Sequence, residues 1–274
     1  MTSGILVNAG ERLGIDCAVD WAGALISEAA DGGLLDGDPS AGTVLIRVEA
    51  SRDPFDTAGW EPIARGASGN HGSLVLRNLL STGFDLRVDT GAGPGPGPGT
   101  AGTAAVPPRF TFRWRPGRRE RAMALALRSR FHLLARSALL RYPALWAAGT
   151  RGRAPLHASA CTAGNNGVAL LAGPGGVGKS TLVAKELAAG GSAICDNVCV
   201  SDGAGAWGVV EPLRVEGGSS AGGGRRMQHG RREAHMPGRV PSLVPDRIVV
   251  LRRGVTGTAS VRPCSPEAAT RVLV

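Results

Sequence analysis

A glycine-rich segment places a lysine and a hydroxyl side chain where they could bind phosphate. Residues 173–180 read GPGGVGKS and match the pattern G-x-x-x-x-G-K-[S/T]. In such a loop backbone N–H groups converge on phosphate oxygens, and the start of the following helix adds partial positive charge. Lys179 and Lys185 are the only lysines among 31 basic residues, so a chance match is improbable. The glycines expected to contact phosphate are Gly173, Gly175, Gly176 and Gly178.

The side chains that follow these glycines can supply charge and a metal ligand. Lys179 can reach the β- and γ-phosphates of a nucleotide, and the Ser180 hydroxyl can ligate Mg²⁺. Thr181 is a further candidate for contact with the nucleotide, and it is better placed for the first turn of the expected helix than for the metal. The metal also needs a carboxylate, for which Asp196 is the first candidate and Glu211 the second. Each acid also has an ordinary interpretation, a turn cap for Asp196 and a surface position for Glu211.

The segments around this loop fit a phosphate site. Residues 168–172 predict a short buried strand, and residues 180–189 predict a helix that ends at two glycines. The apolar run 193–195 predicts a neighbouring strand that ends in Asp196. A hairpin is expected next, formed and closed by residues 197–200, 206–210 and 211–214.

Taken together, these residues resemble the C-terminal catalytic domain of HPr serine kinase/phosphorylase, which is itself similar to the nucleotide-binding domain of phosphoenolpyruvate carboxykinase. The resemblance covers about residues 153–274. It rests on the glycine loop, on Leu156-His157-Ala158 sixteen residues before Gly173, and on Cys195-Asp196-Asn197 where the family has a pair of Asp. It implies an α/β fold with a P-loop kinase core that uses ATP and Mg²⁺ to phosphorylate a serine hydroxyl.

The resemblance also implies roles for individual residues. Asp196 matches the first family Asp, which accepts the proton of the attacking hydroxyl. His157 matches a histidine near the phosphates; without the resemblance it is an ordinary histidine at a strand end. Arg231 and Arg232 lie in a segment that resembles a basic lid and would face the transferring phosphoryl group, or else form a solvated loop. Asn197 replaces the second family Asp, so the metal would have fewer charged ligands.

The parts that flank this core differ from the family. Residues 247–251 resemble a late strand of the related kinases. The sequence stops at Val274, within a helix expected at 266–274, so the terminal helices of the family are expected to be short or absent. The N-terminal half does not resemble the N-terminal domain of HPr kinase. It is closer to divergent relatives found near peptide-tailoring genes, some of which phosphorylate a serine on a ribosomal peptide.

Residues 1–150 are expected to form a smaller α+β region, followed by the nucleotide-binding domain at 151–274. Alternating polarity predicts strands at 43–50, 73–80 and 83–90 and an edge strand at 109–115. The Gly- and Pro-rich segment 91–108 has no packing face and is expected to be a flexible linker or loop.

A helix is expected at about residues 118–141, with a second short helix starting near Pro143 and ending near Gly149. The apolar stripe of the helix at 118–141 favours packing of this helix on its own domain over binding to a membrane surface. The residues of the stripe are Met123, Leu127, Phe131, Leu134 and Ala138.

The composition excludes several classes of protein. Hydrophobic residues make up 43% and charged residues 19% of the chain, so a core can form and wholesale disorder is excluded. Arginines interrupt every apolar run before it reaches the about 20 residues that a membrane helix needs, and no signal-peptide pattern begins the chain. Five scattered cysteines argue against a disulfide framework and a zinc site. The cytoplasm is the expected compartment.

The charge is unevenly spread along the chain. Residues 1–107 carry six arginines against thirteen acids, whereas residues 108–274 carry 25 basic residues against nine acids. A basic half suits nucleotides and acidic peptides, and nucleic acid ranks low because no recognised motif accompanies the charge. The expected partners are therefore a nucleotide and a protein or ribosomal peptide acceptor, with a homo-oligomer left open. The alternatives are a non-catalytic nucleotide-binding module and a small-molecule kinase.

Overall fold

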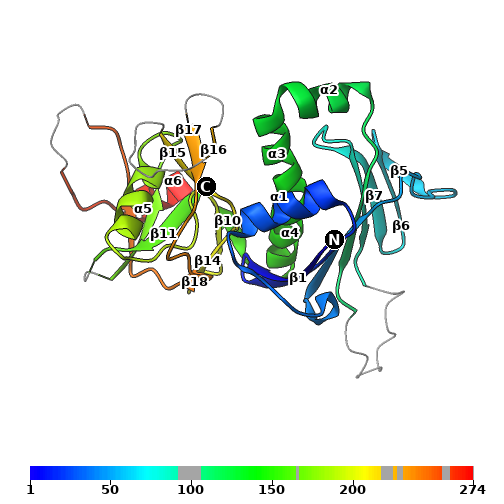
Figure 1. The fold of residues 1–274 in the computed structure, drawn as a ribbon. Coiled ribbons are helices and arrows are strands. Elements are labelled where there is room, and N and C mark those ends of the chain that lie inside the picture. Colours follow the sequence, from blue (N-terminus) through cyan, green and yellow to red (C-terminus); the bar gives the residue numbers. More distant parts are fainter. Residues whose placement is uncertain (92–105, 165–166, 217–224, 227–230, 255–259, 274) are drawn as a thin grey trace, which may run out of the picture. The chain divides into compact units, whose positions relative to one another are not determined.

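The computed structural model divides the chain into two compact units, each with helices and sheets (Figure 1). Unit 1 comprises Met1–Val7 and Glu11–Ala144, and unit 2 comprises Asn8–Gly10 and Leu145–Val274. Among the described residues, no helix is long and apolar enough to cross a membrane. The residues that the structure describes are 1–91, 106–164, 167–216, 225–226, 231–254 and 260–273.

Unit 1 is built on a nine-stranded sheet with the order β3-β1-β2-β4-β9-β8-β7-β6-β5. The β2–β4 and β4–β9 pairs are parallel, and the strands from β9 to β5 pair antiparallel. The strands are β1 (Thr2–Asn8), β2 (Glu11–Cys17), β3 (Leu34–Leu35), β4 (Val44–Glu49), β5 (Glu61–Ala64), β6 (Ala67–Asn70), β7 (Ser73–Leu79), β8 (Phe84–Asp89) and β9 (Arg109–Trp114).

The strands expected at 43–50, 73–80 and 83–90 are confirmed as β4, β7 and β8, but the edge position expected for 109–115 is wrong. β9 lies between β4 and β8 in the sheet. Successive side chains of a strand point to opposite faces, and residues 110–112 are all buried, so both faces of β9 are covered. Of the segment 91–108, residues 92–105 lie outside the described part of the chain. The segment joins β8 to its antiparallel neighbour β9 within one sheet.

An aromatic cluster covers one face of this sheet. Trp21 of α1 (Asp20–Ala30) lies 5.6 Å from Phe84 of β8 and 5.0 Å from Trp114 of β9, measured between ring centroids. Its ring also lies 5.6 Å from that of Phe131 in α3 (Arg128–Arg136). The two helices therefore pack over the face that carries Phe84 and Trp114.

The single helix expected at 118–141 is wrong. The chain forms α2 (Arg118–Ala126), breaks at Leu127 with φ −119° and ψ 47°, and resumes as α3 and a π-helical turn at Ser137–Arg141. The break leaves α2 without a buried residue, while Phe131 in α3 reaches the aromatic cluster. The expected docking therefore holds only for the second half of the stripe. The short helix near Pro143 is confirmed as α4 (Tyr142–Thr150).

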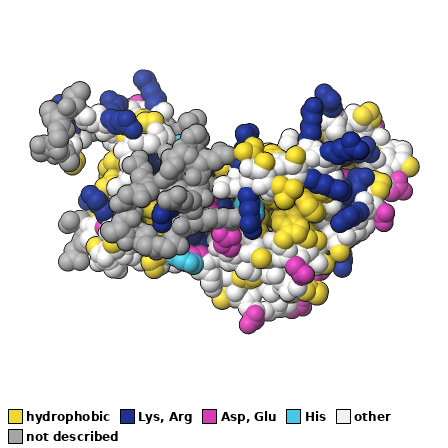
Figure 2. All heavy atoms as spheres, turned by 45° about the horizontal axis from the view of Figure 1, so that its top comes forward, with side chains coloured by type: hydrophobic (Ala, Val, Ile, Leu, Met, Phe, Trp, Pro, Cys, Tyr) yellow, Lys and Arg dark blue, Asp and Glu magenta, His cyan; other side chains and the backbone are white. Residues whose placement is uncertain are grey.

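The exposed leucines on either side of Ala126 lie among arginines. Leu125 is 84% and Leu127 is 42% exposed, and Arg118, Arg121 and Arg128 beside them are exposed as well. On the face shown in Figure 2, basic side chains likewise border hydrophobic ones on the surface of unit 1.

The described residues of unit 2 form three smaller sheets, with the orders β10-β13-β14-β18, β11-β12-β19 and β15-β17-β16. β12 pairs antiparallel with β11 and parallel with β19. The strands expected at 168–172 and 247–251 are thus confirmed, as is the hairpin, formed by β13 and β14. The strands are β10 (Ala154–Leu156), β11 (Ala158–Thr162), β12 (Val168–Ala172), β13 (Cys199–Ser201), β14 (Ala206–Gly208), β15 (Leu213–Glu216), β16 (Arg225–Arg226), β17 (Arg231–Ala234), β18 (Ser242–Leu243) and β19 (Arg247–Val250).

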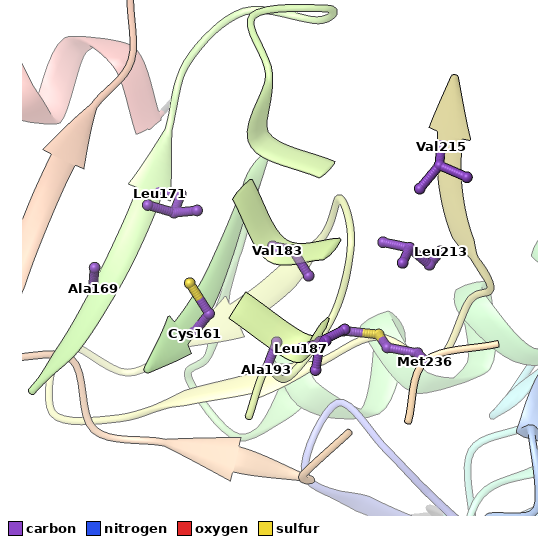
Figure 3. Close-up of a cluster of buried hydrophobic side chains, with 9 residues drawn as sticks. All are labelled: Cys161, Ala169, Leu171, Val183, Leu187, Ala193, Leu213, Val215 and Met236. Carbon is purple, nitrogen blue, oxygen red and sulfur yellow. The ribbon is translucent and has the colours of Figure 1, made fainter. Parts of the chain in front are cut away.

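Helix α5 (Lys179–Ala188) covers an apolar core that joins it to β11, β12 and β15 (Figure 3). The expected helices at 180–189 and 266–274 are thereby confirmed, the second as α6 (Pro266–Leu273). All five cysteines are free, and only Cys264 is exposed. The core side chains drawn in Figure 3 are Cys161, Ala169, Leu171, Val183, Leu187, Ala193, Leu213, Val215 and Met236.

Candidate functional site

The glycine loop of unit 2 connects the buried strand β12 to the N-terminus of α5. Gly176 and Gly178 have φ values of +76° and +111°, a region that residues with a Cβ rarely adopt. Gly173 is required by packing as well, because a Cβ there would lie 2.9 Å from the carbonyl oxygen of Leu251. At Gly175 a Cβ would meet nothing within 4 Å, so neither packing nor a positive φ accounts for this glycine. Its backbone is open to a ligand.

Lys179 folds back over the loop rather than into solvent. Only 5% of the residue is exposed, and its Nζ donates to the carbonyl oxygens of Gly173 at 2.6 Å and Pro174 at 3.3 Å. Burial lowers the pKa of the ammonium, and the negative charge of Asp196 acts against this shift. The lysine therefore places a positive charge inside the loop, close to a carboxylate.

Asp196 is the carboxylate that the fold brings to this lysine. It is 2% exposed, and its Oδ2 accepts a hydrogen bond of 3.1 Å from the backbone N–H of Arg214. Burial raises the pKa of Asp196, while hydrogen bonding from the Ser180 hydroxyl and the charges of Arg214 and Lys179 act to lower it. Its Oδ1 is buried and has no hydrogen-bond partner among the described residues. This oxygen is available to a metal ion or a substrate hydroxyl.

The apolar run before Asp196 is not the strand that its sequence predicts. Only Ala193 forms bridges, one with Cys161 in β11 and one with Arg239. The carbonyl of Cys195 accepts a hydrogen bond from the Ser159 hydroxyl, so a side chain replaces the backbone ladder there. The run still lies beside β11, and β11 pairs with β12, the strand that precedes the glycine loop.

Glu211 and Asp196 both lie close to Arg214. The Arg214 guanidinium pairs with the Glu211 carboxylate, and its Nε lies 4.0 Å from Asp196 Oδ2. The segment 211–214 does not close the hairpin as expected, because Leu213 already starts β15 in a different sheet. Sequence reasoning did not single out Arg214, since its contacts with both acids arise only from the packing of β15.

The remaining predicted residues lie around this centre without joining it. His157 is exposed between β10 and β11, and its Nε2 lies 2.9 Å from Asn197 Oδ1. Thr181 is exposed on the first turn of α5. Arg231 and Arg232 belong to β17 in the third sheet, so the solvated loop considered for these two positions is wrong. The backbone of Arg232 pairs with β15 and β16.

The described residues contain no group of three or more His, Cys, Asp or Glu side chains that could hold a metal ion. A magnesium ion here would therefore depend on Ser180, Asp196 and oxygens supplied by a bound phosphate. The unpartnered Oδ1 of Asp196 fits this role, because Mg²⁺ prefers carboxylate oxygens.

No protein-family model matches this chain, and no curated protein matches it. Its function is therefore inferred from the residues of the site.

Proposed function

We propose that this protein is an ATP-dependent kinase with a P-loop core similar to that of HPr kinase, and that it phosphorylates a serine hydroxyl of a protein or peptide. One observation carries the proposal: the glycine loop, the buried Lys179 and the buried Asp196 come together at the end of β12. A buried lysine and a buried aspartate are costly to the fold, which favours a role for them in ligand binding or catalysis.

The loop and α5 would bind the phosphates of the nucleotide. Backbone N–H groups from Gly175 to Ser180 precede or begin the helix, where its partial positive charge is greatest. Lys179 would turn from the loop carbonyls toward the β- and γ-phosphates, exchanging neutral acceptors for charged ones. Ser180 and Asp196 would hold Mg²⁺, which when bound neutralises charge on the phosphates.

Asp196 would also act on the acceptor. In the transfer step the serine oxygen forms a bond to the γ-phosphorus, the bond from that phosphorus to the β–γ bridging oxygen breaks, and ADP leaves. The proton of the serine hydroxyl passes to the Asp196 carboxylate. Burial raises the pKa of this carboxylate in the metal-free protein, which favours uptake of a proton.

A specific observation favours a second candidate, a nucleotide-binding module without turnover. Asn197 stands where the related kinases have a second Asp, and its Oδ1 lies 2.9 Å from His157 Nε2. A neutral side chain engaged in this way offers less to a metal than a carboxylate does. Binding of the nucleotide would then regulate another process. Within the kinase hypothesis, a small-molecule acceptor is a further alternative.

The two lysines of the chain allow a matched test of nucleotide binding. Calorimetric titration with ATP and Mg²⁺ should give an affinity that Lys179→Ala lowers by about 100-fold, since a buried charge contact to phosphate is lost. Lys185→Ala, on the exposed side of the same helix, should bind like wild type. Equal affinity of the Lys179 and Lys185 variants would refute a phosphate-binding loop.

A further inference from the structure

The parallel pairing of β12 and β19 brings a second segment to the glycine loop. The two strands are in register from Ala169–Arg247 to Ala172–Val250, and the N–H of Leu251 donates to the carbonyl of Ala172 at 2.8 Å. Because parallel strands end at the same edge of a sheet, the residues after β19 leave the sheet beside the residues after β12. The glycine loop follows β12, and Leu251-Arg252-Arg253-Gly254 follows β19.

Arg253 contacts the glycine loop directly. Its Nη2 donates to the carbonyl oxygen of Gly176 at 3.2 Å. A Cβ at Gly176 would lie 3.8 Å from the same Nη2, so the guanidinium lies against the middle of the loop. Among the described residues no carboxylate forms an ion pair with Arg253, whereas Arg247 at the start of β19 pairs with Asp246. Within that part of the chain, no acid neutralises the charge that Arg253 holds against the loop.

We propose that Arg253 is a nucleotide-binding residue that contacts the phosphates and makes affinity rise with their number. This inference rests on the proposed function, because it assumes that the glycine loop binds a nucleotide. The contact with Gly176 uses one of the five N–H donors of a guanidinium, which leaves a planar fork that matches the geometry of phosphate oxygens. The preferred ligand is then a nucleoside triphosphate, for which Lys179 and Arg253 supply charge from two different segments.

The test compares ligands that differ in phosphate number or lack the base. Calorimetry would measure ATP, ADP and inorganic tripolyphosphate, each with Mg²⁺, for wild type and Arg253→Ala. We expect Arg253→Ala to weaken ATP and tripolyphosphate about tenfold and ADP less, as the loss of a charged hydrogen bond predicts. Arg253→Lys should recover part of the affinity because it keeps the charge. Arg247→Ala, at the far end of β19, should bind all three ligands like wild type.

Two results would overturn the inference while leaving the proposed function in place. In the first, Arg253→Ala binds ATP like wild type, although Lys179→Ala does not. In the second, ATP binding weakens but tripolyphosphate binding does not, which would assign Arg253 to the base. If wild type bound none of the three ligands, the proposed function would fail and the inference with it. Thermal unfolding of Arg253→Ala should match wild type, because the side chain is exposed.

Discussion

Each unit contains a buried aspartate, and the two differ in whether their carboxylate oxygens have hydrogen-bond partners. In unit 1, Asp85 is 5% exposed and both of its oxygens have partners: Oδ1 accepts from the backbone N–H of Asn78 at 2.9 Å, and Oδ2 from Arg115. In unit 2, Asp196 is 2% exposed, yet its Oδ1 has no partner in the part of the chain that the structure describes. Asp85 is explained by the fold, whereas Asp196 leaves an oxygen that the fold does not use.

Two glycines show the same difference. A Cβ at Gly14 in unit 1 would lie 1.8 Å from the carbonyl oxygen of Pro39, so close packing requires a glycine there. A Cβ at Gly175 in unit 2 would meet nothing within 4 Å. Residues whose type the fold does not explain are the ones most expected to serve a ligand. In unit 2, Gly175 and Asp196 are two such residues.

The largest change in stability should come from removing the negative charge of Asp85 in unit 1. Asp85→Asn should lower the free energy of unfolding by about 2 kcal/mol, because Arg115 would lose its ionic partner in a largely buried place. Urea denaturation would measure the loss, and hydrogen exchange of the β8 and β9 amides would localise it. Asp89→Asn, which alters a more exposed pair with Arg87, should cost less than about 1 kcal/mol. Equal costs at the two positions would contradict this account of unit 1.

The same substitution in unit 2 should have a smaller effect of opposite sign. Asp196→Asn should raise the stability of the nucleotide-free protein by about 1 kcal/mol at neutral pH, since it removes a charge that burial disfavours. The matched control is Asp202→Asn, on an exposed loop where backbone hydrogen bonds lower the pKa of the aspartate. That change should lower stability rather than raise it.

The pH dependence of this gain follows from the raised pKa of Asp196. The unfolded carboxyl loses its proton near its ordinary pKa of 3.8, whereas the folded one keeps its proton to higher pH. The cost of charging Asp196 is therefore absent below the unfolded pKa, grows as pH rises, and is complete above the folded pKa. The advantage of Asp196→Asn should follow that course in urea denaturation between pH 4 and pH 8. A pH-independent difference would contradict the raised pKa.

Local patterns predicted the elements whose signals are contained in short stretches. The strands at 43–50, 73–80 and 83–90 alternate in polarity between turn residues, and all three are present. β1 and β2 were not predicted, although they run through most of the first 17 residues. Their buried residues cluster instead of alternating, because both faces of these strands are covered.

Features that depend on packing between distant segments could not be predicted. No glycine or proline marks the helix break at Leu127 in the sequence. The helix after the break carries Phe131, which packs against Trp21. In the candidate site, the pattern identified Lys179 and Asp196 but missed the contacts that Arg214 and Arg253 make. Strand pairing brings both arginines to the site. Arginine is so frequent in this sequence that neither residue stands out from its local pattern.

The measurement that tests the central claim most directly is transfer of labelled γ-phosphate from ATP to serine-containing peptides and proteins encoded by neighbouring genes. The account predicts transfer by wild type, more transfer by Asn197→Asp, and none by Asp196→Asn, because the base acts mainly in the transition state. Asp196→Asn should still bind ATP through the glycine loop, Lys179 and Ser180. Loss of ATP binding in Asp196→Asn would instead make this residue chiefly a metal ligand. ATP binding without transfer by wild type or Asn197→Asp, across these acceptors, would contradict the kinase and favour the non-catalytic module.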